Sequence, residues 1–279
     1  MLSDEHLKAL YFEQDGSKIF PNTDIKGGIV ITYHDKTKNF GAIKAFTSYP
    51  ELNNILKKVT AVCDSYLDDI ISQRGCYRFS ERFFRDFPSA SKKMGAGSGN
   101  MVVSNIFEKI PEAFFEKKPE DGEIYIKLLG RANNARAYRY IARKYVLDND
   151  FIDTYNVFVP EANVSGTIGE TLPTPVIGLA ATGHTDTFLS IGKFETLQEA
   201  EHCLKYVKSK FARTMLGILK ATQHNPPSTW KYVPLQDFTA NSDIDWSKSV
   251  AEIDQQLYRK YDLTADEIEF IETHVKEMA

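Results

Sequence analysis

Two segments of the sequence interleave basic and aromatic side chains in a pattern that suits contact with phosphates. The first covers residues 74–93 and the second covers residues 131–144. Between residues 74 and 144 there are 15 Lys and Arg against 8 Asp and Glu, a local charge of +7. The planar guanidinium of arginine can bridge phosphates or read the edge of a guanine base. The two clusters therefore predict contact with nucleic acid.

If both segments are helical, each places three arginines on one face, because side chains three and four positions apart are neighbours on a helix. The first set is Arg78, Arg82 and Arg85, and the second is Arg136, Arg139 and Arg143. For any single arginine, the alternative is a solvated basic face with an aromatic core behind it. Two clusters so close together favour DNA, and Asn133 and Asn134 within the second cluster are expected to add adenine contacts. The predicted DNA-binding residues are Arg74, Arg78, Arg82, Arg85, Lys92, Lys93, Arg131, Asn133, Asn134, Arg136, Arg139 and Arg143.

The charge of the whole chain hides this signal. Over 279 residues, 34 Lys and Arg face 38 Asp and Glu, a net charge of -4 that by itself argues against a DNA-binding protein. Residues 237–279 account for much of the acidity, with 4 Lys and Arg against 11 Asp and Glu. Such an acidic end is a poor surface for DNA. It is better suited to packing on a partner or to keeping the chain in solution.

Two short motifs suggest catalysis when they are taken alone. Gly95-x-Gly97-x-Gly99 has the form of a cofactor loop, and residues 225–228 read Asn-Pro-Pro-Ser. In amino-methyltransferases, an Asn-Pro-Pro-aromatic motif binds the target amino group of a flipped base. No buried strand precedes the glycines, and a serine replaces the aromatic residue in the second motif. The sequence therefore predicts a surface loop and a helix stop, with no catalytic or cofactor-binding residue in this chain.

Metal ligands are not expected either. His184 is predicted to lie in a loop or at the end of a strand. Asp243 and Asp245 have the carboxylates of a metal site, but their surroundings favour a turn anchored by Trp246. The three cysteines are too few for a disulfide framework, and no apolar run reaches the length of a membrane span. With no basic, apolar leader at the start of the sequence, a cytoplasmic location without a membrane partner is expected.

The elements that position these residues are a mixture of strands and helices. Apolar runs at 28–33 and 40–46 predict a hairpin, and 124–129 and 155–159 predict further strands. Boxes of the form Ser/Thr-x-x-Glu mark four helix starts, at Ser48, Thr196, Ser249 and Thr264. The helix that starts after Thr196 is expected to carry its apolar face to Leu219 and to stop before Pro226. The fold class predicted is α+β, with an N-terminal hairpin, a mixed sheet with helices, and short C-terminal helices.

Several segments resemble bacterial type II restriction–modification adenine-specific DNA methyltransferases, including those fused to an endonuclease. Residues 1–8 and 19–29 are similar to the segment that closes the catalytic domain of that family. Residues 183–192, 199–201 and 208–213 resemble its target-recognition region, and residues 230–236 and 242–246 resemble the stretch that follows. The resemblance covers most of the chain.

The resemblance implies three parts: a stub of the catalytic domain over 1–48, a DNA target-recognition domain over 49–236, and an acidic helical tail over 237–279. In the family, the cofactor loop and the Asn-Pro-Pro-aromatic motif precede the segment that begins this sequence. We therefore expect the chain not to methylate DNA alone. The implied partners are double-stranded DNA, a catalytic domain that holds S-adenosylmethionine, and a nuclease in the fused members.

Two alternatives remain open at this point. One is a stand-alone S-adenosylmethionine-dependent methyltransferase that uses residues 95–99 and 225–228. The other is a specificity or interaction subunit that docks a partner through its C-terminal helices.

Overall fold

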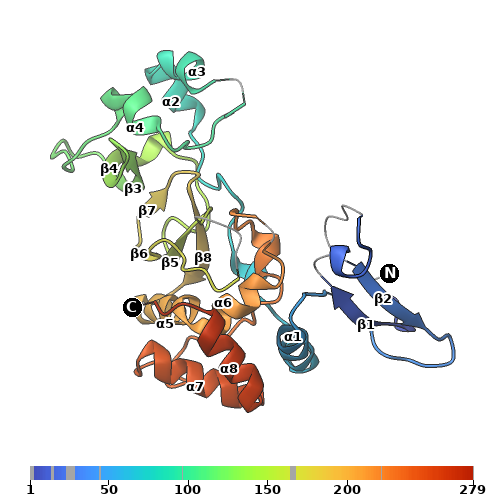
Figure 1. The fold of residues 1–279 in the computed structure, drawn as a ribbon. Coiled ribbons are helices and arrows are strands. Elements are labelled where there is room, and N and C mark those ends of the chain that lie inside the picture. Colours follow the sequence, from blue (N-terminus) through green and yellow to red (C-terminus); the bar gives the residue numbers. More distant parts are fainter. Residues whose placement is uncertain are drawn as a thin grey trace.

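The computed structural model describes residues 3–13, 16–22, 29–43, 45–95, 97–163, 168–220 and 222–278. They form an α+β fold, as the sequence predicts, with small sheets in place of one large one. Figure 1 shows an upper part built mainly from residues 76–152 and a lower part that contains the C-terminal helices. Each part has its own main hydrophobic cluster, so the two arginine-rich segments lie on a separate small core.

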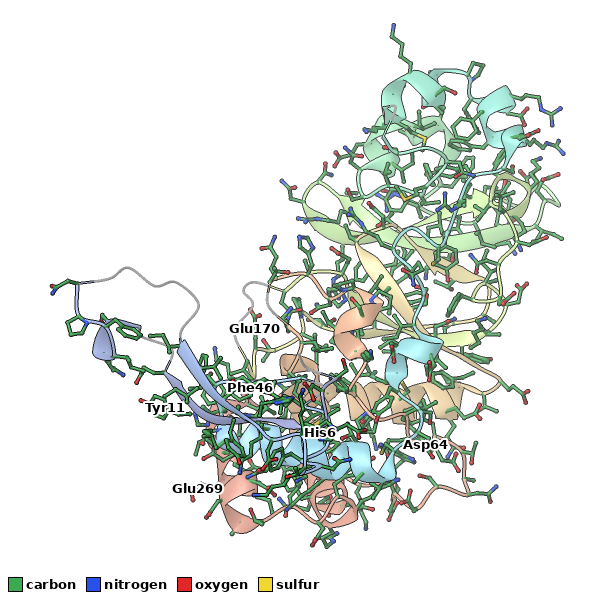
Figure 2. All side chains as sticks on the ribbon, turned by 90° about the vertical axis from the view of Figure 1, so that its right-hand side faces the viewer. His6, Tyr11, Phe46, Asp64, Glu170 and Glu269 are labelled. Carbon is green, nitrogen blue, oxygen red and sulfur yellow. The ribbon has the colours of Figure 1, made fainter. Side chains whose placement is uncertain are left out.

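The N-terminal residues form a ribbon of two antiparallel strands, β1 (Leu7–Glu13) and β2 (Ile29–His34), with a short 3-10 turn at Gly16–Lys18. In both views the ribbon lies at the level of the lower part and away from the upper part (Figures 1 and 2). The predicted pairing of 28–33 with 40–46 is wrong, because residues 40–43 and 45–46 form no strand. Gly41 adopts a left-handed φ of 75°, which departs from regular extended backbone.

Helix α1 (Pro50–Val62) follows the ribbon and packs an apolar side into the larger core, whereas Val62 at its end is exposed. The expected capping box at Ser48 does not form, because the helix starts one residue later, after Tyr49. Asn53 replaces it: its side chain accepts a hydrogen bond from the Thr47 N–H (2.8 Å) and donates one to the Thr47 carbonyl (2.9 Å). A 3-10 helix, η2 (Leu67–Ile70), leads toward the upper part.

The upper part contains short helices packed on one face of a β-hairpin. The helices are α2 (Glu81–Asp86), α3 (Ser89–Met94), α4 (Ile106–Lys109) and η3 (Pro111–Ala113). The hairpin is β3 (Tyr125–Ala132) and β4 (Ala135–Ala142), followed by η4 (Arg143–Tyr145). β3 also pairs in parallel with β7 (Thr182–His184), which makes this sheet mixed.

The lower part contains a second sheet and the longer helices. The sheet has the order β6 (Val176–Gly178), β5 (Tyr155–Pro160), β8 (Phe188–Phe194). The helices are α5 (Leu197–Lys208), α6 (Lys210–Gly217), η5 (Pro227–Trp230), α7 (Val250–Lys260) and α8 (Ala265–His274). α7 and α8 bury their apolar sides in the same cluster as α1 and α5, so residues 237–279 belong to the larger core.

Three predicted capping boxes are present, at Thr196, Ser249 and Thr264. The single helix expected from Thr196 to residue 219 is wrong, because Ser209 interrupts it. Ser209 is extended, with φ −60° and ψ 149°, and its hydroxyl accepts the Ala212 N–H to start α6. A second local N-cap therefore overrides an apolar pattern that continues across the break.

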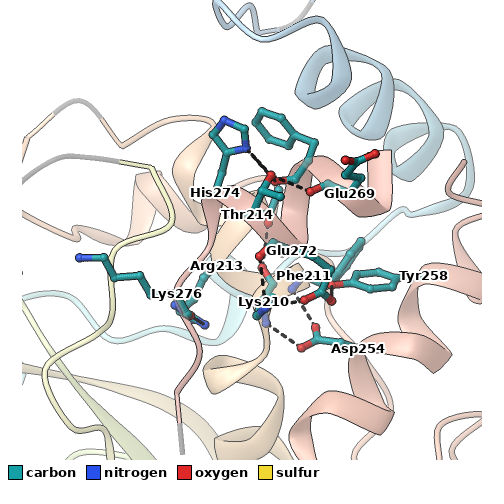
Figure 3. A network of polar contacts seen from close by, with 12 residues as sticks. Lys210, Phe211, Arg213, Thr214, Asp254, Tyr258, Glu269, Glu272, His274 and Lys276 are labelled. Atoms are coloured by element: carbon teal, nitrogen blue, oxygen red, sulfur yellow. Dashed lines mark hydrogen bonds and ion pairs between the residues drawn. The ribbon is translucent and has the colours of Figure 1, made fainter. Parts of the chain in front are cut away.

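Buried polar contacts join α6 to α7 and α8 (Figure 3). The Asp254 carboxylate accepts the backbone N–H groups of Lys210 (3.0 Å) and Phe211 (2.9 Å) in the first turn of α6. Burial raises the pKa of Asp254 to about 6. The buried Arg213 guanidinium donates to the Lys276 carbonyl, which ties the last residues of the chain to α6.

Helix length bears on membrane insertion. α1, the longest helix that the structure describes, has 13 residues, whereas a bilayer needs about 20. Over the described ranges, no helix is long and apolar enough to cross a membrane.

Candidate nucleic-acid interface

A tight turn at Asn133 and Asn134 controls the geometry of the second arginine cluster. Their φ angles of 51° and 59° are both left-handed, as the two-residue turn of a β-hairpin requires. The turn places Arg131 directly opposite Arg136. The predicted helical face of Arg136, Arg139 and Arg143 is therefore wrong. Successive strand side chains point to opposite faces, so positions 136 and 139 face opposite sides of the sheet, and Arg143 lies beyond β4 in η4.

The tip of this hairpin is an exposed cluster of four predicted site residues: Arg131, Asn133, Asn134 and Arg136. The Arg131 guanidinium donates to the Asn134 carbonyl (3.1 Å), and the Asn133 backbone N–H donates to the Glu108 carboxylate (3.0 Å). These bonds hold the backbone of the tip. Within the described residues, the two asparagine side-chain amides make no hydrogen bond, so their donors and acceptors face solvent.

A pocket of about 350 Å³ opens beside the tip. Arg136 lies against one wall, with its guanidinium carbon 5.2 Å from the centroid of the Phe188 ring. The same guanidinium donates to the carbonyls of Pro173 (2.5 Å) and Thr174 (2.6 Å), which fixes its plane. Partial burial lowers the pKa of Arg136, because desolvation disfavours the charged form. The lining residues are Arg131, Asn134, Arg136, Pro160, Glu161, Ala162, Pro173, Thr187 and Phe188.

Two predicted arginines are paired with carboxylates. Arg139 forms an ion pair with Glu116 (2.7 Å), and Arg143 forms one with Asp148. Both guanidiniums are largely covered, with side-chain exposures of 22% and 21%. The structure therefore separates these two arginines from the exposed tip, and their charges are already compensated.

The first cluster divides in a similar way. Arg78 lies outside α2, in an extended segment bridged to Met101, and donates to the Asn100 side chain (3.0 Å). The predicted helical face is therefore wrong for Arg78. The helix cannot start earlier, because the Phe79 N–H donates across to the Asn100 carbonyl (2.7 Å). Arg82 and Arg85 do lie three positions apart on α2, and both are exposed.

Lys92 and Lys93 occupy the last turn of α3 and are also exposed. α2 and α3 are in contact with each other, so these lysines and the two α2 arginines are exposed on neighbouring helices. Arg82 has a long ion pair with Asp86 (3.6 Å). In the described part of the chain, Arg85, Lys92 and Lys93 pair with no carboxylate. We call these four residues the α2–α3 corner.

Arg74 is held by a buried carboxylate from a distant part of the sequence. Its guanidinium donates to the Asp186 side chain (2.8 Å) and carbonyl (3.3 Å), while the Arg74 side chain stays 58% exposed. The other Asp186 carboxylate oxygen is buried and has no hydrogen-bond partner among the described residues. Asp186 precedes Thr187 in the pocket wall, so one turn carries both the support of Arg74 and part of the pocket.

The two catalytic motifs have structural explanations. Gly95 and Gly99 are exposed, with left-handed φ angles of 82° and 55°, in a turn that follows α3, and Ala96 lies outside the described residues. Asn225 is fully buried. Its side-chain oxygen accepts from Lys220 (2.5 Å), and its amide donates to Asn163 (2.6 Å). Asn225 therefore has no free group for a substrate amino group.

His184 ends β7, as predicted, and lies between the two parts of the molecule. Its ring contacts Tyr77 and Phe158 edge to face, and its two nitrogens bond to the Thr185 carbonyl (2.8 Å) and the Ser190 hydroxyl (2.9 Å). Complete burial lowers its pKa to about 4, so the ring is neutral at physiological pH.

The acidic turn near Trp246 also has a structural role. Asp243 pairs with Lys260 (2.9 Å), and Asp245 accepts from the Ser247 hydroxyl (2.6 Å). Trp246 is buried beside them, which confirms the predicted turn. In the described residues there is no group of three or more His, Cys, Asp or Glu side chains that could hold a metal ion.

Lys127 and Phe188 belong to this surface but escaped the sequence analysis. Lys127 lies four positions before Arg131, on the same face of β3. Phe188 comes from β8. Reading residues 124–142 as a hairpin around Asn-Asn would have found Lys127, because period-two alternation selects positions 127, 129 and 131. The contact of Phe188 with Arg136 joins residues 52 positions apart, and no local pattern indicates it.

Comparison with known proteins assigns no family. No protein-family model matches the chain. No curated protein matches it significantly.

Proposed function

We propose that this chain is a DNA-recognition module that presents a duplex site to a methyltransferase catalytic domain. The observation that carries the proposal is the exposed hairpin tip, where a rigid turn displays two arginines and two asparagines. A two-stranded β-ribbon fits the major groove, where arginine pairs with guanine and asparagine with adenine. The resemblance of residues 183–192, 199–201 and 208–213 to target-recognition regions, elsewhere in the chain, also supports the proposal.

The charged residues divide into two roles in this proposal. The α2–α3 corner supplies phosphate contacts, which set position but carry no sequence information. The hairpin tip reads base edges. We assign Arg74 to the residues that read base edges. The buried Asp186 holds its guanidinium in one orientation, which lowers the conformational entropy lost when Arg74 binds DNA.

Residues 1–48 are proposed to pack on the catalytic domain. The β1–β2 ribbon exposes apolar side chains, including Leu10 (56%), Val30 (44%) and Ile31 (50%). Tyr11, labelled on the ribbon in Figure 2, is 48% exposed. An isolated two-stranded ribbon is only marginally stable in water, and it gains stability by joining a larger sheet. These features support a role for the ribbon as a docking element.

In the alternative function, a partner docks on the C-terminal helices. The outward sides of α7 and α8 would form that docking surface. Their inward sides are used by the core of this chain, with Ile253, Leu257 and Ile271 fully buried. A partner would therefore meet a mainly acidic surface. Such a surface is unsuited to DNA, which supports a proposed interface on the upper part.

Duplex binding measured as a function of salt tests the proposal. A random-sequence duplex pool is incubated with the full chain at low salt, and the retained duplexes are sequenced. We expect retention that weakens as salt increases, with log K falling by about 0.9 per phosphate contact for each unit of log salt. We also expect enrichment of a short sequence. No retention of any duplex at low salt would refute the proposal.

A further inference from the structure

One face of the β3–β4 hairpin carries a continuous row of basic and aromatic side chains. Facing pairs along the two strands are Arg131 with Arg136, Leu129 with Tyr138, and Lys127 with Tyr140. Because successive strand positions alternate between the two faces, all six share a face of the sheet. Leu129 is buried there against Phe158 and Phe188, and the basic and aromatic side chains lie around it. Arg136 to Tyr140 covers roughly 14 Å of β4, at about 3.4 Å per residue.

Phe115 extends this row across the sheet, because it pairs with Tyr140 on the side of β4 opposite β3. It exchanges two backbone hydrogen bonds with Tyr140, at 2.9 and 2.8 Å, so their side chains lie next to each other on the same face. Phe115 is 40% exposed, and its ring packs edge to face on Tyr125 at 5.9 Å. We call Phe115, Lys127, Arg136, Tyr138 and Tyr140 the tyrosine strip.

The charge at the centre of the strip is not neutralised. The Lys127 ammonium lies 4.5 Å from the Tyr138 ring centroid and 5.8 Å from the Tyr140 centroid. It pairs with no carboxylate in the described ranges. Two carboxylates from the adjoining segments have other partners: Glu116 pairs with Arg139, and Glu123 pairs with Lys144 (2.6 Å). The strip thus presents half-buried rings around an available cation.

We propose that the tyrosine strip binds unpaired nucleotides, such as a strand exposed when a duplex is locally opened. Aromatic rings can stack on bases only where the bases are unpaired and unstacked, and the cations would contact the phosphates between them. The inference rests on the proposed function, because it names a second form of nucleic acid bound by the same hairpin.

A protein partner is the competing occupant of this surface. Tyrosine and phenylalanine are common in protein interfaces as well. The strip differs from an ordinary apolar docking face, because two cations, Lys127 and Arg136, interrupt its rings and no carboxylate pairs with either one within the described residues. A polyanion with flat faces satisfies both features, and so the unpaired strand is favoured.

Fluorescence anisotropy with the full chain tests the inference. The probes are a labelled 12-nucleotide single strand and a blunt duplex of the same sequence, at one low salt concentration. We expect Tyr140→Leu and Lys127→Gln each to weaken single-strand binding about tenfold, as loss of one stacking or charge contact does, and to change duplex binding less than twofold. Phe115→Leu, at a more exposed ring, replaces Tyr140→Leu if circular dichroism shows that variant to be unfolded.

The chain offers a matched control on the N-terminal ribbon. There the Lys8 ammonium lies 5.7 Å from the Tyr33 ring centroid and 5.0 Å from that of Phe40. Lys8→Gln and Tyr33→Leu should leave single-strand binding unchanged, and a loss equal to that of the strip variants overturns the inference.

The outcomes separate this inference from the proposed function. Duplex binding with no single-strand binding, or with single-strand binding that ignores the strip variants, overturns the inference and leaves the proposed function standing. Single-strand binding that is lost in Tyr140→Leu, without any duplex binding, supports the inference and overturns the proposed function.

Discussion

The Asn133–Asn134 turn provides the sharpest test of the proposed interface, because it separates conformation from recognition. Both residues are left-handed, a region that costs an ordinary L-residue roughly 1–2 kcal/mol and that asparagine and glycine tolerate. Replacing both by alanine should therefore destabilise the hairpin by about 2–4 kcal/mol. Asn134→Gly removes one amide but keeps the turn, so it should leave the hairpin as stable as before.

Amide hydrogen exchange over residues 125–142 measures this local stability. A loss of about 2–4 kcal/mol corresponds to exchange that is roughly 30- to 700-fold faster in the double-alanine variant. In Asn134→Gly, exchange should stay within a few-fold of the parent, while duplex affinity falls if the Asn134 amide reads a base. Exchange unchanged in the double-alanine variant would refute the left-handed turn, and with it the register that places Arg131 opposite Arg136.

Three further predictions follow from the same geometry. Arg131→Gln should weaken specific duplex binding about 5- to 150-fold in an anisotropy titration, whereas the ion-paired Arg139→Gln should change it less than twofold; equal effects would contradict the assignment of the tip. Asp186→Asn should weaken duplex binding several-fold by releasing Arg74, and an unchanged affinity removes Arg74 from the interface. Burial lowers the pKa of His184 to about 4, so the folded state binds fewer protons than the unfolded one and stability should rise by about 3 kcal/mol between pH 4 and 6.5. In urea unfolding, the free energy of unfolding of His184→Gln should lack this part of the rise. An identical pH dependence in both proteins would contradict the prediction.

The starts of α5, α7 and α8 were predictable, because their signals are local. Thr196, Ser249 and Thr264 start their helices with the side-chain bonds that their sequence spacing predicts. Ser209 is the instructive exception, since an N-cap within an apolar pattern ended one helix and began another. Local patterns fail where two of them compete within a few residues.

The sequence by itself determined the α+β class and the segments that carry positive charge. Only the tertiary structure decided which of those charges remain available. Glu116, 23 positions from Arg139, pairs with an Arg139 side chain that is only 22% exposed. Asp186, 112 positions from Arg74, orients a guanidinium whose side chain stays 58% exposed. The reason is physical: an ion pair depends on which segments the fold brings within about 4 Å, and neither composition nor periodicity contains that distance.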